Sequence, residues 1–190
     1  MEVFKGIPFI VDRQKLKDSL QLRDTTRINN MLDYLIRNAE KIANAKGIYK
    51  KLTIDHRDAS AIVIEGIPFH SKVLAESTKG KKDVFPYIIT CGTEIEDWSE
   101  SIDGLMEKYI VDGIKSMILF DSTQYIANHI LKIYQLESLD YHIPGFLDDW
   151  SIYEQKELFA LLGEDVQATG VYLTESSLMR PTKSVSGIYY

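Results

Sequence analysis

The sequence predicts a single α+β domain with a mixed or antiparallel twisted sheet and flanking helices. Helical and strand-like stretches are mixed along the 190 residues, without the regular alternation of a doubly wound parallel fold. Hydrophobic residues make up 45% of the chain and charged residues 26%, which permits a sizeable core and argues against disorder. Since no flexible linker or internal repeat divides the chain, residues 1–190 are expected to form one domain.

The charge and cysteine content exclude several classes of protein. A net charge of −6, from 22 basic and 28 acidic residues, disfavours nucleic-acid binding, which needs a concentrated basic surface. The one basic run, residues 79–82, is expected to be an exposed turn. Cys91 is the only cysteine, so no intramolecular disulfide is possible and a cytoplasmic location is the default.

Membrane and metal sites are also not expected. No apolar run reaches the ~18 residues that a spanning helix needs, and the first residues lack the pattern of a signal peptide. The four histidines and Cys91 do not show metal-ligand spacing, so no metal site is predicted.

The first third of the chain begins with a weakly alternating stretch, and residues 1–24 are interpreted as a possible N-terminal arm containing an edge strand. Residues 25–46 have apolar residues at three- and four-residue steps, which predicts a helix capped by Thr25 or Thr26 and ended by Gly47. Residues 48–54 and 61–64 favour two strands, with His56-Arg57-Asp58 in the turn between them.

The middle third contains the clearest strand. Residues 69–77 favour a short helix, and residues 84–90 are apolar and β-branched, with Pro86 indicating an early or edge position. Gly92 then favours a sharp turn into a helix capped by Thr93. A long helical region follows at 95–136, where Gly104 and Gly113 either interrupt the helix or allow close packing.

The last stretch, 144–190, is dense in turn-forming and aromatic residues. Pro144-Gly145 indicates a tight turn, followed by an acidic and aromatic loop, a short helix, a strand and a final strand that contains Gly and Ser. Such a composition is unusual for a fraying end and is typical of the wall of a binding site. No dinucleotide fingerprint, phosphate loop or nucleophile elbow is present elsewhere.

This stretch resembles the activation domain of cobalamin-dependent methionine synthase, and within that family the stand-alone members. Pro144-Gly145-Phe146 with Asp148-Asp149-Trp150 resembles the family's turn, and 154–162 resembles the helix after it. The final signature is resembled almost position for position by residues 173–176, Met179, Pro181 and residues 183–187. Upstream, Thr90-x-Gly92-x-Glu94 resembles a further family motif. Close resemblance covers about a quarter of the chain.

The resemblance implies a reactivation factor for a cobalamin-dependent methyltransferase or corrinoid protein. Such a domain binds S-adenosylmethionine and presents its methyl group to the cobalamin that the partner carries, while flavodoxin or ferredoxin supplies an electron. The expected contribution of the protein is positioning, so no catalytic acid or base is required.

The resemblance also implies ligand-binding residues within 141–190, namely Tyr141, Ile143, Gly145, Phe146 and Tyr189. Tyr141 stands where the family has an arginine, and Phe146 stands where it has a tyrosine. Losing the guanidinium removes a group that pairs with the ligand carboxylate.

Plainer interpretations stay open beside these roles. In these interpretations Gly145 serves only a turn, Tyr189 packs on the body of the domain, and Trp150 is a packing anchor. The function likewise has an alternative, a non-catalytic module that binds a corrinoid protein but has lost S-adenosylmethionine binding. A weaker possibility is a small-molecule binder that has reused the pocket.

Overall fold

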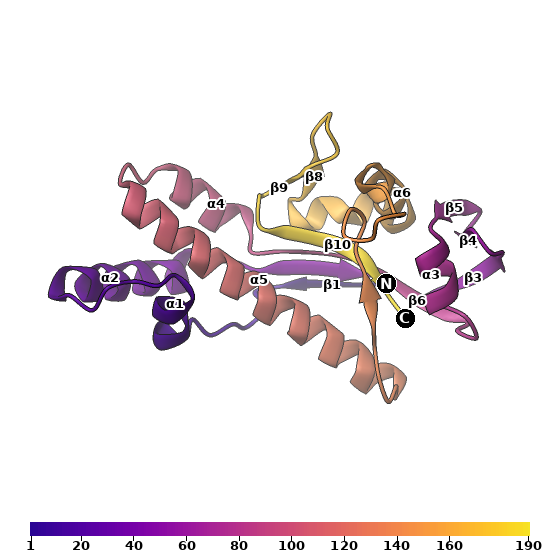
Figure 1. The fold of residues 1–190 in the computed structure, drawn as a ribbon, viewed down its shortest axis with the longest axis horizontal. Helices are drawn as coiled ribbons and strands as arrows, with labels where there is room; N and C mark the ends of the chain where they lie inside the picture. Colours follow the sequence, from indigo (N-terminus) through magenta and orange to yellow (C-terminus); the bar gives the residue numbers. More distant parts are fainter.

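In the computed structural model, which describes residues 1–190, an eight-stranded sheet is organised around strand β6 (Asp83–Thr90) (Figure 1). One side of β6 pairs with β10 (Ser184–Tyr189), and the other pairs in succession with β2 (Lys46–Tyr49) and β3 (Leu52–Arg57). Every pairing is antiparallel. The α+β sheet with flanking helices that the sequence predicted is therefore confirmed, in its antiparallel form.

Both faces of β6 are covered. Phe85, Tyr87 and Ile89 belong to the main core, which the helices α2 (Thr26–Ile42), α4 (Thr93–Glu100) and α5 (Leu105–Tyr134) complete. Ile88 points to the opposite face and belongs to a small core with residues of α6 (Gln155–Leu162) and η2 (Gly163–Thr169). Because both faces are buried, β6 is apolar along its length rather than alternating, which made it the clearest strand in the sequence.

The expectation that Pro86 marks an early or edge position is wrong, because β6 is central. The Pro86 carbonyl accepts a hydrogen bond from the Lys50 N–H at 3.1 Å. The nitrogen and the carbonyl of one strand residue point toward the same neighbouring strand. The Pro86 nitrogen therefore faces the gap at Lys50-Lys51, between the end of β2 and the start of β3. A proline is tolerated there because no ladder hydrogen bond is lost.

Residues 1–24 form an edge strand and a helix against the body. Strand β1 (Glu2–Lys5) pairs with β2, as the edge-strand interpretation expected. Helix α1 (Arg13–Ser19) was not predicted, and its Leu16 is fully buried. The segment is anchored by burial in the main core, and Ile7 is among the buried residues.

Helix α2 (Thr26–Ile42) is capped by Thr25, as predicted. It ends before Gly47, contrary to expectation, because Gly47 lies in β2. A side chain at Gly47 would meet Ile126 of α5, so this glycine allows close packing of strand and helix.

The next elements form a lobe at one end of the sheet, and three boundaries differ from the prediction. Residues 48–54 are divided between β2 and β3, His56 and Arg57 extend β3 so that only Asp58 of the predicted turn lies in the turn, and Phe69 lies in a strand rather than a helix. The predicted strand at 61–64 is confirmed as β4. The lobe is built from β3, β4 (Ala61–Ile64), β5 (Ile67–His70) and α3 (Lys72–Ser77).

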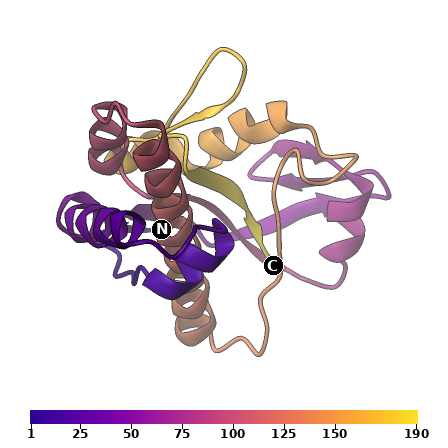
Figure 2. The same cartoon turned by 60° about the vertical axis from the view of Figure 1, so that its left-hand side comes forward.

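The predicted helical region at 95–136 is two helices, α4 (Thr93–Glu100) and α5 (Leu105–Tyr134). Gly104 precedes α5 and interrupts the helix, whereas Gly113 lies within α5 and contacts α1. Thr93 is the first residue of α4 instead of its cap, because Gly92 occupies the cap position with φ 103°. Figure 2 shows α5 crossing the sheet with the N-terminal helices beside it.

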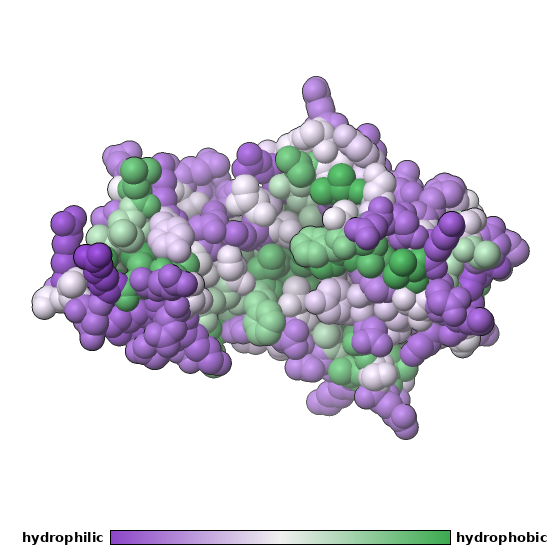
Figure 3. Space-filling model, in the orientation of Figure 1, coloured by the Kyte–Doolittle hydropathy of each residue, from purple (hydrophilic) through white to green (hydrophobic).

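The C-terminal elements cover the opposite face of the sheet and return to β6. They are β7 (Tyr141–His142), η1 (Ile152–Glu154), α6 (Gln155–Leu162), η2 (Gly163–Thr169), β8 (Tyr172–Leu173), β9 (Met179–Arg180) and β10. The short helix and final strand were predicted, whereas the single strand predicted between them is a hairpin of two short strands, β8 and β9. In Figure 3, hydrophobic residues gather over the middle of the face shown, and hydrophilic residues dominate both ends.

None of the helices combines the length and the apolar character that crossing a membrane requires.

Candidate functional site

One hollow of about 230 Å³, here called the aromatic hollow, lies between α5 and the strands β6, β7 and β10. Nine of its twelve lining residues are hydrophobic, and none is charged. The lining residues are Tyr87, Phe120, Thr123, Gln124, Ala127, Asn128, Leu131, Leu139, Tyr141, Ile143, Val185 and Tyr189.

Three tyrosines form one wall of the hollow. Tyr87 and Tyr189 stack with ring centroids 4.1 Å apart, and Tyr141 meets Tyr189 edge-on at 6.0 Å. The register explains this cluster, because Tyr189 lies opposite Tyr141 in β7, and Gly187 lies opposite Tyr87 in β6. A side chain at Gly187 would come within 2.9 Å of the Tyr87 hydroxyl and would collide with the His142 carbonyl. Gly187 therefore permits both the ring stacking and the close approach of β7.

Two tyrosines of this wall, Tyr87 and Tyr189, stay uncharged at ordinary pH. Burial raises the pKa of Tyr87 well above its usual value, and the neighbouring Tyr189 and Tyr141 raise it further. Burial, followed by the neighbouring Tyr141, likewise raises the pKa of Tyr189. The Tyr189 hydroxyl donates a hydrogen bond to the Thr123 carbonyl of α5 at 3.3 Å. This bond connects the strand wall to the helix wall.

Helix α5 supplies the opposite wall and most of its polar atoms. Its contribution runs from Phe120 to Leu131 at helical spacing and includes the side-chain amides of Gln124 and Asn128, one turn apart. Amide groups can pair with the hydrogen-bonding edge of a purine base. The hollow thus combines aromatic surface with neutral donors and acceptors.

The structure brings together three of the five residues that the family resemblance implied. Tyr141, Ile143 and Tyr189 all line the aromatic hollow. Gly145 and Phe146 do not line it, and Phe146 is 85% exposed. The Ile143 carbonyl accepts a hydrogen bond from the Phe146 N–H at 3.1 Å, so that carbonyl already serves the turn.

Gly145 and the loop after it hold the turn in place. Gly145 has φ 82°, and its N–H donates to the Trp150 carbonyl at 2.7 Å. Trp150 is fully buried and packs edge-on against Phe69, which agrees with its interpretation as a packing anchor. Burial would raise the pKa of Asp149, but hydrogen bonds from Ser71 and the first turn of α3 outweigh it and hold the pKa below its usual value.

The polar residues of the C-terminal signature have structural partners. Ser186 donates to the Gln155 side chain, which donates to the Ser177 carbonyl. Glu96 accepts hydrogen bonds from Thr182 and forms a buried ion pair with Lys115 at 2.8 Å. The hydrogen bonds from Lys115 and Thr182 outweigh the effect of burial and hold the pKa of Glu96 below its usual value. These contacts hold β10 against α6 and the segment before it against α4.

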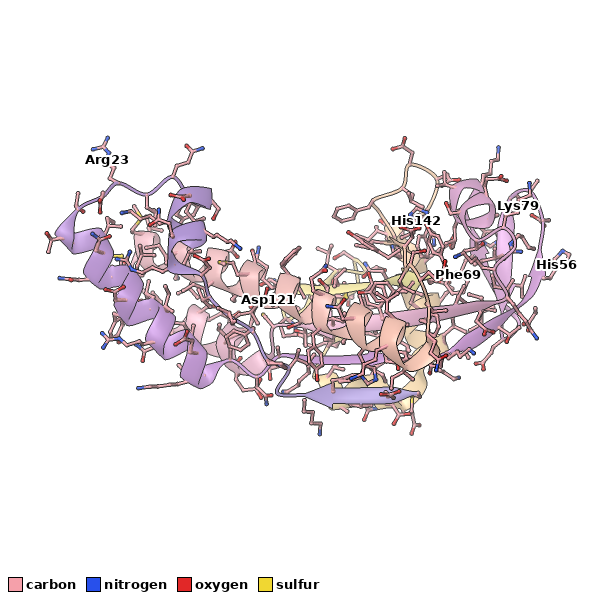
Figure 4. All side chains as sticks on the ribbon, turned by 90° about the horizontal axis from the view of Figure 1, so that it is seen from below. Arg23, His56, Phe69, Lys79, Asp121 and His142 are labelled. Carbon is pink, nitrogen blue, oxygen red and sulfur yellow. The ribbon has the colours of Figure 1, made fainter.

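A second and larger hollow of about 680 Å³, here called the charged groove, lies on the same helix beside α1. It shares only Phe120 with the aromatic hollow, and its lining includes Asp12, Lys15, Asp112 and Asp121. The Asp121 carboxylate accepts a hydrogen bond from the Ile10 N–H at 2.8 Å. In Figure 4, Asp121 lies on α5 in the middle of the molecule. Arg23 marks one end of the molecule, and His56 and Lys79 mark the other. No three His, Cys, Asp or Glu side chains gather as a metal site.

The helical wall of the aromatic hollow and part of its strand wall were not predicted from the sequence. Seven hollow residues from 120 to 139 were not predicted as site residues, nor were Tyr87 and Val185. A signal was present, since positions 120, 124, 127, 128 and 131 form a stripe on α5 separate from its buried stripe. That stripe predicts a second contact face of the helix but not its partner.

Comparison with known proteins identifies the fold. No family model matches the sequence, and no curated protein matches it. A solved structure described as the crystal structure of the MetH reactivation domain bound to AdoHcy matches with a TM-score of 0.67 and 20% sequence identity. The match covers 93% of this chain and 64% of that chain. The chain thus has the reactivation-domain fold and spans slightly less than two thirds of that chain's length.

Proposed function

We propose that this chain binds S-adenosylmethionine in the aromatic hollow and acts as the reactivation component for a separate corrinoid protein. The observation that carries the proposal is the convergence of Tyr141, Ile143 and Tyr189 on one hollow. The family resemblance assigned these residues to the ligand, and the protein with the same fold is described as bound to AdoHcy.

The aromatic hollow fits the nucleoside and sulfonium parts of such a ligand. Neutral tyrosine rings can stack on adenine, and a cation near a ring face is attracted by about 0.5–2 kcal/mol. The hollow holds no cation that would repel a sulfonium.

The amino-acid end of the ligand has no ionic partner in the hollow. Tyr141 stands where an arginine would pair with a carboxylate, and its side chain is 56% exposed. Binding would therefore depend on the nucleoside and sulfonium contacts, with the carboxylate directed to solvent.

The proposed reaction requires a one-electron donor, such as flavodoxin or ferredoxin, and the cobalamin of the partner. One electron reduces cobalt(II) to cobalt(I), and methyl transfer then breaks the sulfur–carbon bond, forms the cobalt–carbon bond and leaves S-adenosylhomocysteine. The role of this chain is to hold the sulfonium methyl in line with the cobalt. This role needs no acid or base, which agrees with the uncharged walls.

Calorimetric titration with S-adenosylmethionine, with and without a cobalamin-loaded corrinoid protein, tests the proposal. We expect saturable binding, and methylcobalamin formation when a one-electron reductant is added. The absence of ligand binding under both conditions would contradict the proposal.

One observation favours a second candidate, a corrinoid-protein-binding module without S-adenosylmethionine binding. No charged residue has replaced the missing arginine in the lining. This candidate predicts complex formation with the corrinoid protein but no heat of ligand binding in the same titration.

A further inference from the structure

A three-way hydrogen-bonded contact lies directly behind the aromatic hollow. The His142 Nε2 atom is 2.8 Å from the Ser77 hydroxyl and 2.9 Å from the Tyr190 hydroxyl. Ser77 is the last residue of α3, and Tyr190 follows β10. One imidazole thus joins the lobe, the end of the central sheet and β7. In Figure 4, His142 lies at the side of the lobe that carries Phe69 and Lys79.

Strand β7 depends on this contact because little else holds it. It has two residues and pairs with β10 alone, through Tyr141 and His142. Flanking backbone hydrogen bonds join Asp140 and Tyr190 in both directions at 3.0 and 3.1 Å. The residues on either side of His142, Tyr141 and Ile143, line the hollow.

We infer that His142 is a positioning residue for the aromatic hollow: as a neutral acceptor shared by Ser77 and Tyr190, it seats β7, and its protonation loosens the wall. This inference rests on the proposed function only for its effect on ligand binding. The seating of β7 can be measured without a ligand.

Protonation changes what His142 can bind. With its proton on Nδ1, the neutral ring presents at Nε2 a single lone pair that the two hydroxyls share as donors. The imidazolium carries an N–H there instead, so the hydroxyls must turn to present an oxygen lone pair, and the existing arrangement is lost. The neighbouring charged groups are Asp140, on the approach to β7, and Asp149, in the following loop. Burial raises the pKa of Tyr190, so its hydroxyl keeps its proton and can donate.

The direction of the pH dependence follows from these surroundings. Burial lowers the pKa of His142 below 6.5, and the attraction of Asp140 and Asp149 only partly opposes this. The neutral contact is therefore fully present above the usual pKa of about 6.5, and it is lost as the pH falls toward the lower folded-state value.

Hydrogen exchange at residues 139–143 of the full chain tests the inference, with protection factors measured between about pH 7.5 and 5. We expect protection to fall about fivefold at the acid end, corresponding to one lost hydrogen bond. His142→Gln places a neutral amide there, so the protection of residues 139–143 should no longer depend on pH. His142→Ala should lower that protection at every pH. His56→Gln changes an exposed histidine on β3 and should behave as wild type.

Ser77→Ala provides a milder second variant if His142→Ala disturbs the fold, which exchange within β6 would reveal. Unchanged protection in both variants would overturn the inference, as would an acid profile that persists in His142→Gln. A parallel titration with S-adenosylmethionine should show weaker binding at acid pH. If wild type binds no ligand, the proposed function fails while the exchange result still decides the role of His142.

Discussion

Helix α5 carries two hollows that share Phe120 but differ in chemistry. The aromatic hollow is the smaller, at about 230 Å³, and has no charged lining residue. The charged groove is about 680 Å³ and contains three aspartates and one lysine. One helix thus presents an uncharged face to the strands and a charged face to α1.

The difference separates the kinds of ligand that each hollow suits. Neutral aromatic walls close to the sheet favour a planar group and a diffuse cation. Exposed charges in a wide groove keep their hydration and suit contact with another surface. The proposed ligand site is therefore the smaller hollow.

Blocking each hollow in turn should give the largest contrast. Ala127→Phe places a ring in the aromatic hollow, and Ser116→Phe places the same ring in the charged groove. We expect the first to weaken S-adenosylmethionine binding on the order of a hundredfold, and the second to leave it within about threefold. Calorimetry measures both, and thermal unfolding checks the fold. Equal losses in the two variants would remove the distinction between the hollows.

Adding one methyl group to a glycine at each hollow should have the next largest effect. Gly187→Ala would push against the His142 backbone carbonyl, and we expect it to lower the free energy of unfolding by about 1–3 kcal/mol. Gly113→Ala meets only the terminal methyl groups of the Leu16 and Leu20 side chains. Because alanine favours the helix more than glycine does, the free energy of unfolding should stay within about 1 kcal/mol of the wild-type value. Denaturant unfolding compares them. An unchanged free energy of unfolding in Gly187→Ala would show that β7 tolerates displacement.

Restoring a cation at the mouth of the aromatic hollow should sharpen the contrast further. We expect Tyr141→Arg to strengthen S-adenosylmethionine binding about tenfold through pairing with the ligand carboxylate. Phe146→Arg adds the same charge at an exposed position outside the lining and should have little effect. Unchanged affinity in Tyr141→Arg would mean that this position does not face the carboxylate.

Salt dependence gives the smallest expected effect. Since no charged residue lines the aromatic hollow, raising the salt from about 0.05 to 0.5 M should change the dissociation constant less than about twofold. A steeper dependence would indicate that the charged end of the ligand reaches Lys15 or Asp121 in the neighbouring groove.

Much of the fold could be predicted because local patterns dominate it. The helix capped by Thr25 and the doubly buried strand β6 follow from spacing and apolar content. The errors occur where tertiary contacts decide, as at Gly47, whose role is to admit Ile126. Pro86 was misjudged because the break between β2 and β3 cannot be recognised from β6 alone.

The candidate site was only partly predictable. Tyr141, Ile143 and Tyr189 were predicted through the motif resemblance, and they meet because β7 pairs with β10. The α5 wall was missed because no local pattern says which strands will face Gln124 or Asn128. The contact between His142 and Ser77 joins residues 65 positions apart, and a single sequence carries no signal for it.

The central claim, that uncharged aromatic walls bind a sulfonium, is tested most directly by comparing two ligands that differ by one methyl group and one charge. Calorimetry on the wild-type chain should show S-adenosylmethionine binding about two- to thirtyfold more tightly than S-adenosylhomocysteine, as an attraction of about 0.5–2 kcal/mol between cation and rings requires. Equal or tighter binding of S-adenosylhomocysteine, or no binding of either ligand, would contradict the account.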